Sequence, residues 1–216
     1  MRSPKRLIPS PAVEGDILTR EQSQDIIDRV IKMSTADAIS VNVGSSLTNN
    51  IRFAANQVST AGSVADANVA VTSSYGPKSA TVVTNSLSDD SLRAAVKEAE
   101  ALAKLAPDDP EAMPNLGPQS IKTVDADFAS TENLDAAALA QAALTALEPA
   151  RKAGDLTAAG YLVVSTATNA LGNSAKLFAY HKATNANYTL TVRTTDGTGS
   201  GWAGAEHPDW KKLDVN

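Results

Sequence analysis

Residues 186–195, with the sequence ANYTLTVRTT, carry the pattern that decides the fold class. Apolar and polar side chains alternate along this stretch, in the order Tyr188, Thr189, Leu190, Thr191, Val192 and Arg193. Such an alternation places one face of a strand against a core and the other face toward solvent. Tyrosine, threonine and valine also favour strands over helices. The stretch therefore predicts a half-buried β-strand.

Other runs of the same kind precede it along the chain. We expect strands over residues 39–44, 51–56, 65–71, 78–84, 161–165 and 176–182. Short turns separate the first four of these runs, at residues 44–46, 61–63 and 75–78. Consecutive strands joined by short turns pair antiparallel, because a parallel return needs a long crossover.

Three helices are expected between and before these strands. Thr19 followed by Gln22 forms a capping box that begins a helix ending near residue 34. Ser88 is a good N-cap for a second helix, which ends before Pro107. A third, rich in alanine and leucine, covers residues 133–153, and the prolines of residues 107–118 indicate an extended strap before it. The order helix, four strands, helix, strap, helix, three strands predicts an α+β fold with mostly antiparallel sheet.

Composition excludes several classes of protein. The 216 residues contain no cysteine, which excludes disulfides, a thiol nucleophile and cysteine-bound metals. The net charge of −5 and the lack of a basic run argue against binding to nucleic acid. We find no secretory signal and no apolar run long enough to span a membrane, so we expect a cytoplasmic protein. Residues 1–16, which hold three prolines, are expected to be a flexible lead-in.

No catalytic or metal site emerges from the residues themselves. The two histidines, His181 and His207, do not form a zinc site, and no nucleophile can be placed beside either. The acidic pair 89–90 is explained by the positive end of a helix dipole, and the pair 108–109 does not resemble a calcium loop. The Gly-rich residues 197–201 lack the lysine of a phosphate loop, but they let a partner backbone approach closely.

A set of motifs in one order resembles the TldD/PmbA family, whose members were once called modulators of DNA gyrase. Residues 52–58, RFAANQV, resemble the R-x-A-x-N strand of this family, and residues 84–92, TNSLSDDSL, resemble the start of its helix. The helix of residues 95–104 and the strap at 107–110 also fit. Later, residues 168–172, TNALG, resemble a short turn of the family, and residues 193–201, RTTDGTGSG, resemble its R-x-x-D-G-x-G-x-G segment.

The resemblance implies that residues 17–205 are the N-terminal domain of such a protein. Residues 206–216 would then begin a connection to a missing C-terminal domain, with a frayed natural end as the alternative. TldD-type members resemble zinc peptidases with an H-E-x-x-x-H helix, which this sequence lacks. We therefore expect no catalytic residue, metal ligand or cofactor in this chain, with zinc only in the missing domain, and no peptidase activity of the chain alone.

The leading hypothesis is a non-catalytic domain of a TldD/PmbA-like peptidase system, which helps to form a dimer and a chamber for unfolded peptide. PmbA-type members of the family lack the zinc motif. The sequence therefore leaves open whether the chain is of the TldD type or the PmbA type, and whether it forms a homodimer or a heterodimer. Candidate contacts for peptide or partner are Arg52, Asn56, Arg193, Gly197, Gly199 and Gly201. The alternative is a stand-alone peptide-binding or regulatory module that captures extended chains at a strand edge.

Overall fold

The computed structural model describes residues 17–213, so the flexible segment expected at residues 1–16 lies outside the described residues. The helices within this part are α1 (Arg20–Met33), α2 (Asp89–Leu105), α3 (Ala129–Glu132), α4 (Ala136–Ala153) and the short 3₁₀ helix η1 (Trp210–Lys212). The strands are β1 (Ala38–Ala54), β2 (Gln57–Tyr75), β3 (Lys78–Thr84), β4 (Leu156–Asn173), β5 (Phe178–Thr194) and β6 (Ser200–His207).

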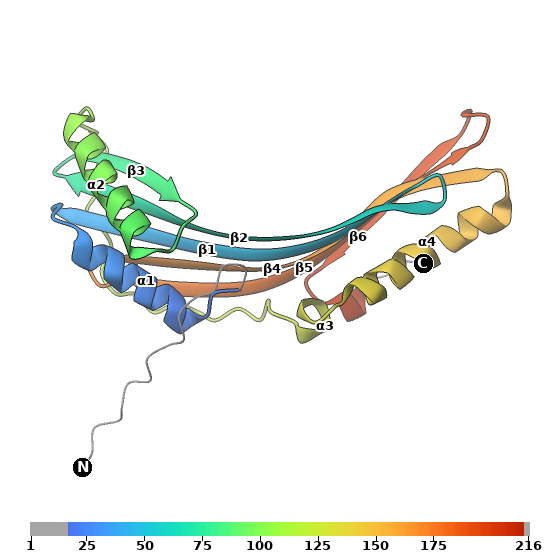
Figure 1. Cartoon of the computed structure of the whole chain (residues 1–216), viewed down its shortest axis with the longest axis horizontal. Helices are drawn as coiled ribbons and strands as arrows, with labels where there is room; N and C mark the ends of the chain where they lie inside the picture. Colours follow the sequence, from blue (N-terminus) through green and yellow to red (C-terminus); the bar gives the residue numbers. More distant parts are fainter. Residues whose placement is uncertain (1–16, 214–216) are drawn as a thin grey trace, which may run out of the picture. The chain divides into compact units, whose positions relative to one another are not determined.

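The strands form one antiparallel sheet in the order β3-β2-β1-β4-β5-β6 (Figure 1). The turn after Tyr75 joins β2 to β3, and Tyr75 lies opposite Lys78. At the other edge, β6 pairs with β5, and Arg193 lies opposite Ser200. The α+β class, the antiparallel sheet and the order of helices and strands predicted from the sequence are therefore confirmed.

The strand boundaries in the first half differ from the prediction. The runs 39–44 and 51–56 are parts of the single strand β1, and the expected turns at 44–46 and 61–63 lie inside β1 and β2. The actual turn between them is at Ala55 and Asn56, both with positive φ. The glycines at 44 and 62 misled the prediction, because each is a position in an extended strand that faces an asparagine side chain.

The second half differs in a similar way. The runs 176–182 and 186–195 are one strand, β5, and β6 was not predicted because glycine-rich residues obscure its alternation. The third helix begins later, at Ala136, and the four-residue α3 precedes it. Within residues 17–213 there are thus six strands rather than seven, and four α-helices rather than three.

The chain divides into two compact units, and β1, β2, β4 and β5 each contribute residues to both. Unit 1 comprises the described residues up to Ser45, with Asp66–Val124 and Thr168–His181. Unit 2 comprises Ser46–Ala65, Asp125–Ala167 and the described residues from Lys182 onward.

The core of unit 1 forms where α1 and α2 pack on one face of β1 and β2. Alternate residues of β1 are buried there, and they meet Ile27 and Val30 of α1 and Leu92 and Val96 of α2. The predicted caps are present, since Thr19 and Gln22 form the capping box of α1 and Ser88 caps α2. Arg29 of α1 forms an ion pair with Asp89 at the start of α2, so the two helices are joined at the surface as well.

The core of unit 2 forms where the single helix α4 packs on β1, β4 and β5. Phe53 and Tyr188 stack at 6.3 Å between ring centroids, and Leu139 and Leu147 of α4 join the same cluster. Gly160 on β4 lets these groups approach, because a Cβ there would lie 2.2 Å from the Thr189 carbonyl oxygen. This glycine is therefore required by close packing rather than by a turn.

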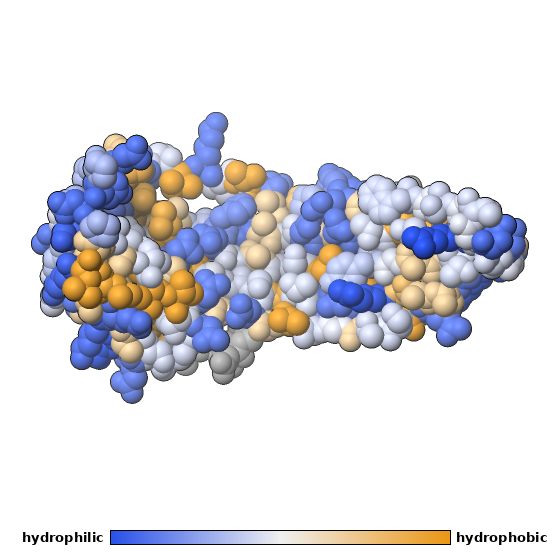
Figure 2. Space-filling model, turned by 90° about the horizontal axis from the view of Figure 1, so that it is seen from above, coloured by the Kyte–Doolittle hydropathy of each residue, from blue (hydrophilic) through white to orange (hydrophobic). Residues whose placement is uncertain are grey.

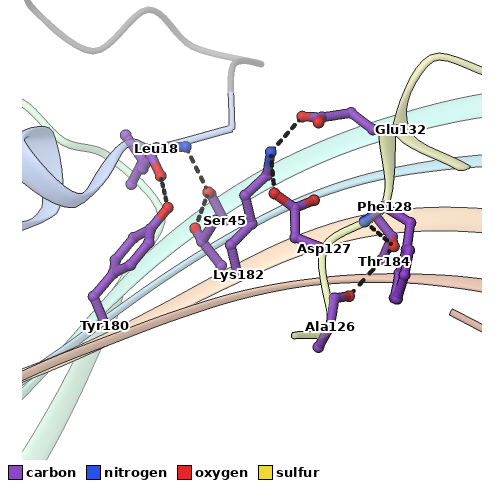
Figure 3. A network of polar contacts seen from close by, with 10 residues as sticks. Leu18, Ser45, Ala126, Asp127, Phe128, Glu132, Tyr180, Lys182 and Thr184 are labelled. Atoms are coloured by element: carbon purple, nitrogen blue, oxygen red, sulfur yellow. Dashed lines mark hydrogen bonds and ion pairs between the residues drawn. The ribbon is translucent and has the colours of Figure 1, made fainter. Parts of the chain in front are cut away.

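Each unit has a set of hydrogen bonds, drawn in Figure 3, that joins a segment outside the helices and strands to the sheet. In unit 1, the Leu18 backbone donates to Ser45 and accepts from the Tyr180 hydroxyl. In unit 2, Thr184 binds the backbone at Ala126 and Phe128. Hydrogen bonds thus hold the residue before the N-cap of α1 and the segment just before α3 against the sheet.

In unit 2, the Lys182 ammonium of β5 adds two ion pairs to the segment around α3. It lies 3.1 Å from a carboxylate oxygen of Asp127 and 2.6 Å from one of Glu132 (Figure 3). Burial opposes its charge, but the hydrogen bonds to Glu132 and Asp127 outweigh this effect and raise the pKa of Lys182. In the part of the chain that the structure describes, no helix is both long enough and apolar enough to cross a membrane.

Candidate functional site

The two faces of the sheet differ in unit 2. One face packs on α4, and the other carries no helix within residues 17–213 (Figure 1). Ile51 and Phe53 face the core, so Arg52 between them points to the other side. By the same alternation, odd-numbered residues of β5 such as Arg193 point to that side. We call this side the open face of unit 2.

Arg52 lies on the open face against an aromatic ring. Its guanidinium carbon is 5.1 Å from the centroid of the Tyr161 ring, a distance that allows a cation–π interaction. Arg52 is exposed, and no acidic side chain within residues 17–213 forms an ion pair with it. The predicted candidate Arg52 is thus a cation available on this surface.

Asn56 joins the β1–β2 turn to β4. Its side-chain amide donates to the Leu156 carbonyl at 2.8 Å, and its side-chain oxygen accepts from the Ala158 amide at 2.7 Å. Its φ of 60° lies in the left-handed region, which asparagine tolerates better than most residues. The geometry gives Asn56 a part in fixing this turn, and its role as a peptide contact remains a prediction.

The glycine-rich residues after β5 form an ordered hairpin turn. The Gly199 amide donates to the Thr194 hydroxyl at 2.9 Å, and the Gly199 carbonyl accepts from the Thr194 amide at 3.0 Å. Gly197 has a φ of 76°, which only glycine adopts without strain. Gly201 belongs to β6, where it lies opposite Val192. The predicted glycines therefore shape the turn and the strand that flank Arg193.

A hollow of 670 Å³ lies beside this turn, at the start of β4 and the end of β5. Several threonines and one arginine supply polar groups to its lining. The lining residues are Thr157, Ala159, Gly160, Thr191, Arg193, Thr194, Thr195 and Gly197. Of the six predicted candidates, the structure brings Arg193 and Gly197 together at this hollow.

Arg193 is the one cation in that lining. It is exposed, and no carboxylate in the described part of the chain pairs with it. The nearest acid along the chain, Asp196, is engaged in the turn, where it accepts from the amide and the hydroxyl of Thr198. Hydrogen bonds from Thr194 and Thr198 lower the pKa of Asp196, so it stays ionised and bound in the turn.

The sequence did not single out Trp202, although it is the most exposed aromatic side chain among the large hydrophobic residues described. Trp202 lies on β6 opposite Thr191, so it shares the open face with Arg193, and it is 69% exposed. A Cβ at Gly204 would lie 2.8 Å from two carbons of the indole, so the ring covers this glycine. The spacing of Trp202 and Gly204 is the signal that could have revealed both β6 and this aromatic surface.

Toward the other end of β6, the open face carries the carboxylate of Glu206, which accepts hydrogen bonds from neighbouring side chains. Glu206 accepts from the side-chain amides of Asn185 at 2.9 Å and Asn187 at 3.3 Å. Asn187 lies opposite Glu206, and Arg193 is six residues further along β5, or about 20 Å at the usual rise of a strand. Figure 2 shows mostly pale residues, of intermediate hydropathy, over unit 2 on the right, with blue ones among them.

The histidines and acidic residues considered in the sequence analysis do not form a catalytic arrangement in the described part of the chain. His207 accepts from the Asp209 amide at 2.9 Å, and His181 is exposed on β5. Asp108 lies 3.9 Å from the Lys78 ammonium. Within residues 17–213, no group of three or more histidine and acidic side chains is arranged to hold a metal ion.

The fold and part of the sequence resemble those of one family of α+β domains. Residues 40–103 match the family model described as PmbA/TldA metallopeptidase domain 1. This match and the fold confirm the resemblance to the N-terminal domain of the TldD/PmbA family. The motifs at 168–172 and 193–201 lie beyond the matched segment. A comparison with curated proteins gave no match.

Three solved structures share the fold at low sequence identity. TldE from Thermococcus kodakarensis has a TM-score of 0.78 at 17% identity, over 89% of this chain and 44% of its own. A protein described as a candidate modulator of a DNA gyrase, from Thermotoga maritima, has a TM-score of 0.78 at 13% identity, over 89% and 45%. A similarly described protein from Bacteroides thetaiotaomicron has a TM-score of 0.76 at 14% identity, over 91% and 47%. This chain therefore spans less than half the length of these solved chains.

Proposed function

We propose that this chain is a non-catalytic domain of a TldD/PmbA-like cytoplasmic peptidase assembly, in which it helps to enclose unfolded peptide substrate. The observation that supports this most is the first-domain match at residues 40–103, together with a fold that covers 44–47% of the related chains. In this proposal, hydrolysis depends on zinc held by another domain or by a partner subunit of the same family.

The chemistry of the described residues is consistent with a role in binding rather than bond cleavage. The open face of unit 2 offers hydroxyls, two arginines and aromatic rings, which bind polypeptide but do not activate water. Hydrolysis assisted by zinc would need at least three protein ligands around the metal. We therefore assign peptide contact, and not catalysis, to this domain.

The first test of the proposal is peptide cleavage. The purified chain would be incubated with zinc and an unstructured peptide, and products would be measured by mass spectrometry against a control containing a chelator. We expect the peptide to remain intact. Cleavage above the metal-free control would overturn the assignment of a non-catalytic domain.

The second test concerns assembly. The chain would be mixed with a TldD-type subunit that carries the zinc motif, from the same organism, and analysed by sedimentation velocity. We expect a complex heavier than either component. A chain that sediments alone in the mixture would contradict the assembly role.

A second candidate function, a stand-alone peptide-binding module, is favoured by the sheet edges. β3 and β6 are the outer strands of the sheet, and an outer strand can accept an extended peptide as an additional strand. A chain that binds unstructured peptide without associating with any subunit would place this alternative first.

A further inference from the structure

We propose that the hollow at the end of β5 binds a carboxylate of an extended peptide, with Arg193 as its partner and Trp202 beside it as a surface for an adjacent side chain. The inference rests on the peptide-receiving part of the proposed function. It adds the chemical class of the ligand, a peptide bearing a carboxylate, and the position in the fold where that group lies.

The first argument is the state of Arg193. A guanidinium presents several N–H donors in a planar fork, which matches the two oxygens of a carboxylate. Arg193 is exposed at the hollow, and all six ion pairs within residues 17–213 use other side chains. The fork therefore has donors to offer, and the hydroxyls of Thr157 and Thr191 line the same hollow as further donors.

The second argument is that the neighbouring acids do not neutralise this site. Asp196 is tied to Thr198 and to Thr194 in the hairpin turn. Asp155 precedes β4, and its carbonyl accepts from the Thr195 amide at 2.9 Å, while its carboxylate is in no ion pair within the described residues. Glu206 is about 20 Å away along the strand and binds two asparagines. None of these three carboxylates forms an ion pair with Arg193 within the described residues, so the guanidinium can still accept a carboxylate from a ligand.

The third argument is the aromatic surface on the same face. Trp202 lies opposite Thr191, which lines the hollow, and its indole lies against Gly204. An indole that is 69% exposed offers a large contact area, and its two side-chain torsions make the loss of entropy on binding small. Arg52 over Tyr161 adds a second cation to this face. These two positive charges favour acidic peptide over basic peptide.

The carboxylate can come from the C-terminus of a peptide or from an aspartate or glutamate side chain. Both present the same planar pair of oxygens, so the structure assigns the chemistry and the experiment distinguishes the sources. Three unstructured eight-residue probes of serine, glycine and threonine serve this purpose. One has a free C-terminus, one has a C-terminal amide, and one has the amide together with a central glutamate.

Binding is measured through Trp202 itself. The chain contains two tryptophans, so W210F leaves Trp202 as the sole indole, and W202F leaves Trp210 as a matched control. We expect the free-acid probe, the glutamate probe or both to change the emission of W210F, and the fully amidated probe to bind about tenfold more weakly. The emission of W202F should not change.

Variants of Arg193 then test its role. In the W210F background, Arg193→Gln should weaken binding of the carboxylate probe about tenfold, and Arg193→Lys should restore part of it. Lys152→Gln is the control, because it removes one positive charge from the exposed end of α4 in the same unit. It should leave binding unchanged.

The outcomes separate this inference from the function on which it rests. Equal binding of all three probes, unaffected by Arg193→Gln, would overturn the carboxylate site and leave peptide binding intact. Absence of binding by every probe at millimolar concentration would overturn both. Equal weakening by Arg193→Gln and Lys152→Gln would show a general effect of charge and would also overturn the site. Circular dichroism of each variant confirms that it is folded.

Discussion

Units 1 and 2 use the same long strands but complete them in different ways. In unit 1, two helices pack on β1 and β2, and polar contacts join their ends, as with Arg29 and Asp89. In unit 2, α4 is the one long helix among the described residues and packs on one face, and the other face presents Arg52, Arg193 and Trp202. The comparison shows two helices packed and linked in unit 1, and in unit 2 a sheet face whose two arginines form no ion pair within the described residues.

The difference also appears in how each unit uses glycine. Gly160 in unit 2 lies against the Thr189 carbonyl and the Phe53 ring, at 2.2 and 2.5 Å from the position of a Cβ. A Cβ at Gly172 in unit 1 would lie 2.5 Å from a methyl carbon of Ile27. A backbone oxygen is held in place by the pairing of the strands, whereas the neighbour of Gly172 is a side chain, although a buried one. Unit 2 therefore depends more strictly on one small residue.

The largest expected effect is that of Gly160→Ala. The new methyl group would clash with the strand backbone, so we expect a loss of about 3 kcal/mol in the free energy of unfolding. Gly172→Ala should cost less, about 2 kcal/mol, because the clash is with a side-chain methyl group and not with backbone. Gly201→Ala is the control, since a Cβ there meets nothing within 4 Å. Urea unfolding measures all three, and an equal loss for Gly160→Ala and Gly172→Ala would contradict the comparison.

The next effect concerns the turn that Asn56 fixes in unit 2. Asn56→Ala removes two hydrogen bonds to β4 and places alanine at a φ of 60°, so we expect a loss of about 2 kcal/mol. Asn56→Gly keeps the conformation and isolates the contribution of the hydrogen bonds. At the neighbouring position, with a φ of 49°, Ala55→Gly should stabilise the turn slightly. If Asn56→Ala left the thermal unfolding temperature unchanged, the turn would not depend on these two hydrogen bonds.

The smallest effect is a dependence of stability on pH in unit 1. Burial opposes the charge of Glu100, but hydrogen bonds from Thr35 and Ser34 outweigh it and lower the pKa of Glu100 below its ordinary value of 4.5. A lowered pKa in the folded state means that this contribution is complete above pH 4.5 and is lost as the pH falls through the folded pKa.

Glu100→Gln tests this contribution. At neutral pH the variant should be less stable by about 1 kcal/mol, a value reduced by solvent screening, and the difference should shrink below pH 4.5. Glu98→Gln, at an exposed position of the same helix, is the control. A difference in unfolding free energy that stays constant from pH 7 to pH 3 would contradict the assignment.

Local signals predicted much of the fold. The capping box at Thr19 and the N-cap at Ser88 are where the sequence placed them, since each depends on neighbours within a few residues. Strand ends were harder to predict, because Gly44 and Gly62 look like turn residues but face asparagines within the sheet. Partners distant in the sequence decide these positions, and one sequence does not contain that information.

The candidate site was predicted only in part. Arg193 and Gly197 were chosen from the segment that lines the hollow, and Arg52 lies on the same open face. Trp202 was overlooked because its place beside Thr191 follows from the pairing of β5 with β6. The motif that contains Asn56 likewise does not show that its side-chain nitrogen and oxygen both form hydrogen bonds with the backbone of β4.

The most direct test of the contrast between the two units is a map of peptide contacts on the whole chain. Amide chemical shifts of the ¹⁵N-labelled protein would be recorded during titration with the unstructured peptide that ends in a free carboxylate. We predict that the largest shift changes fall in unit 2, at residues 157–161 and 191–204, with little change in α1 and α2. Changes concentrated in unit 1, or none at saturating peptide, would contradict the account.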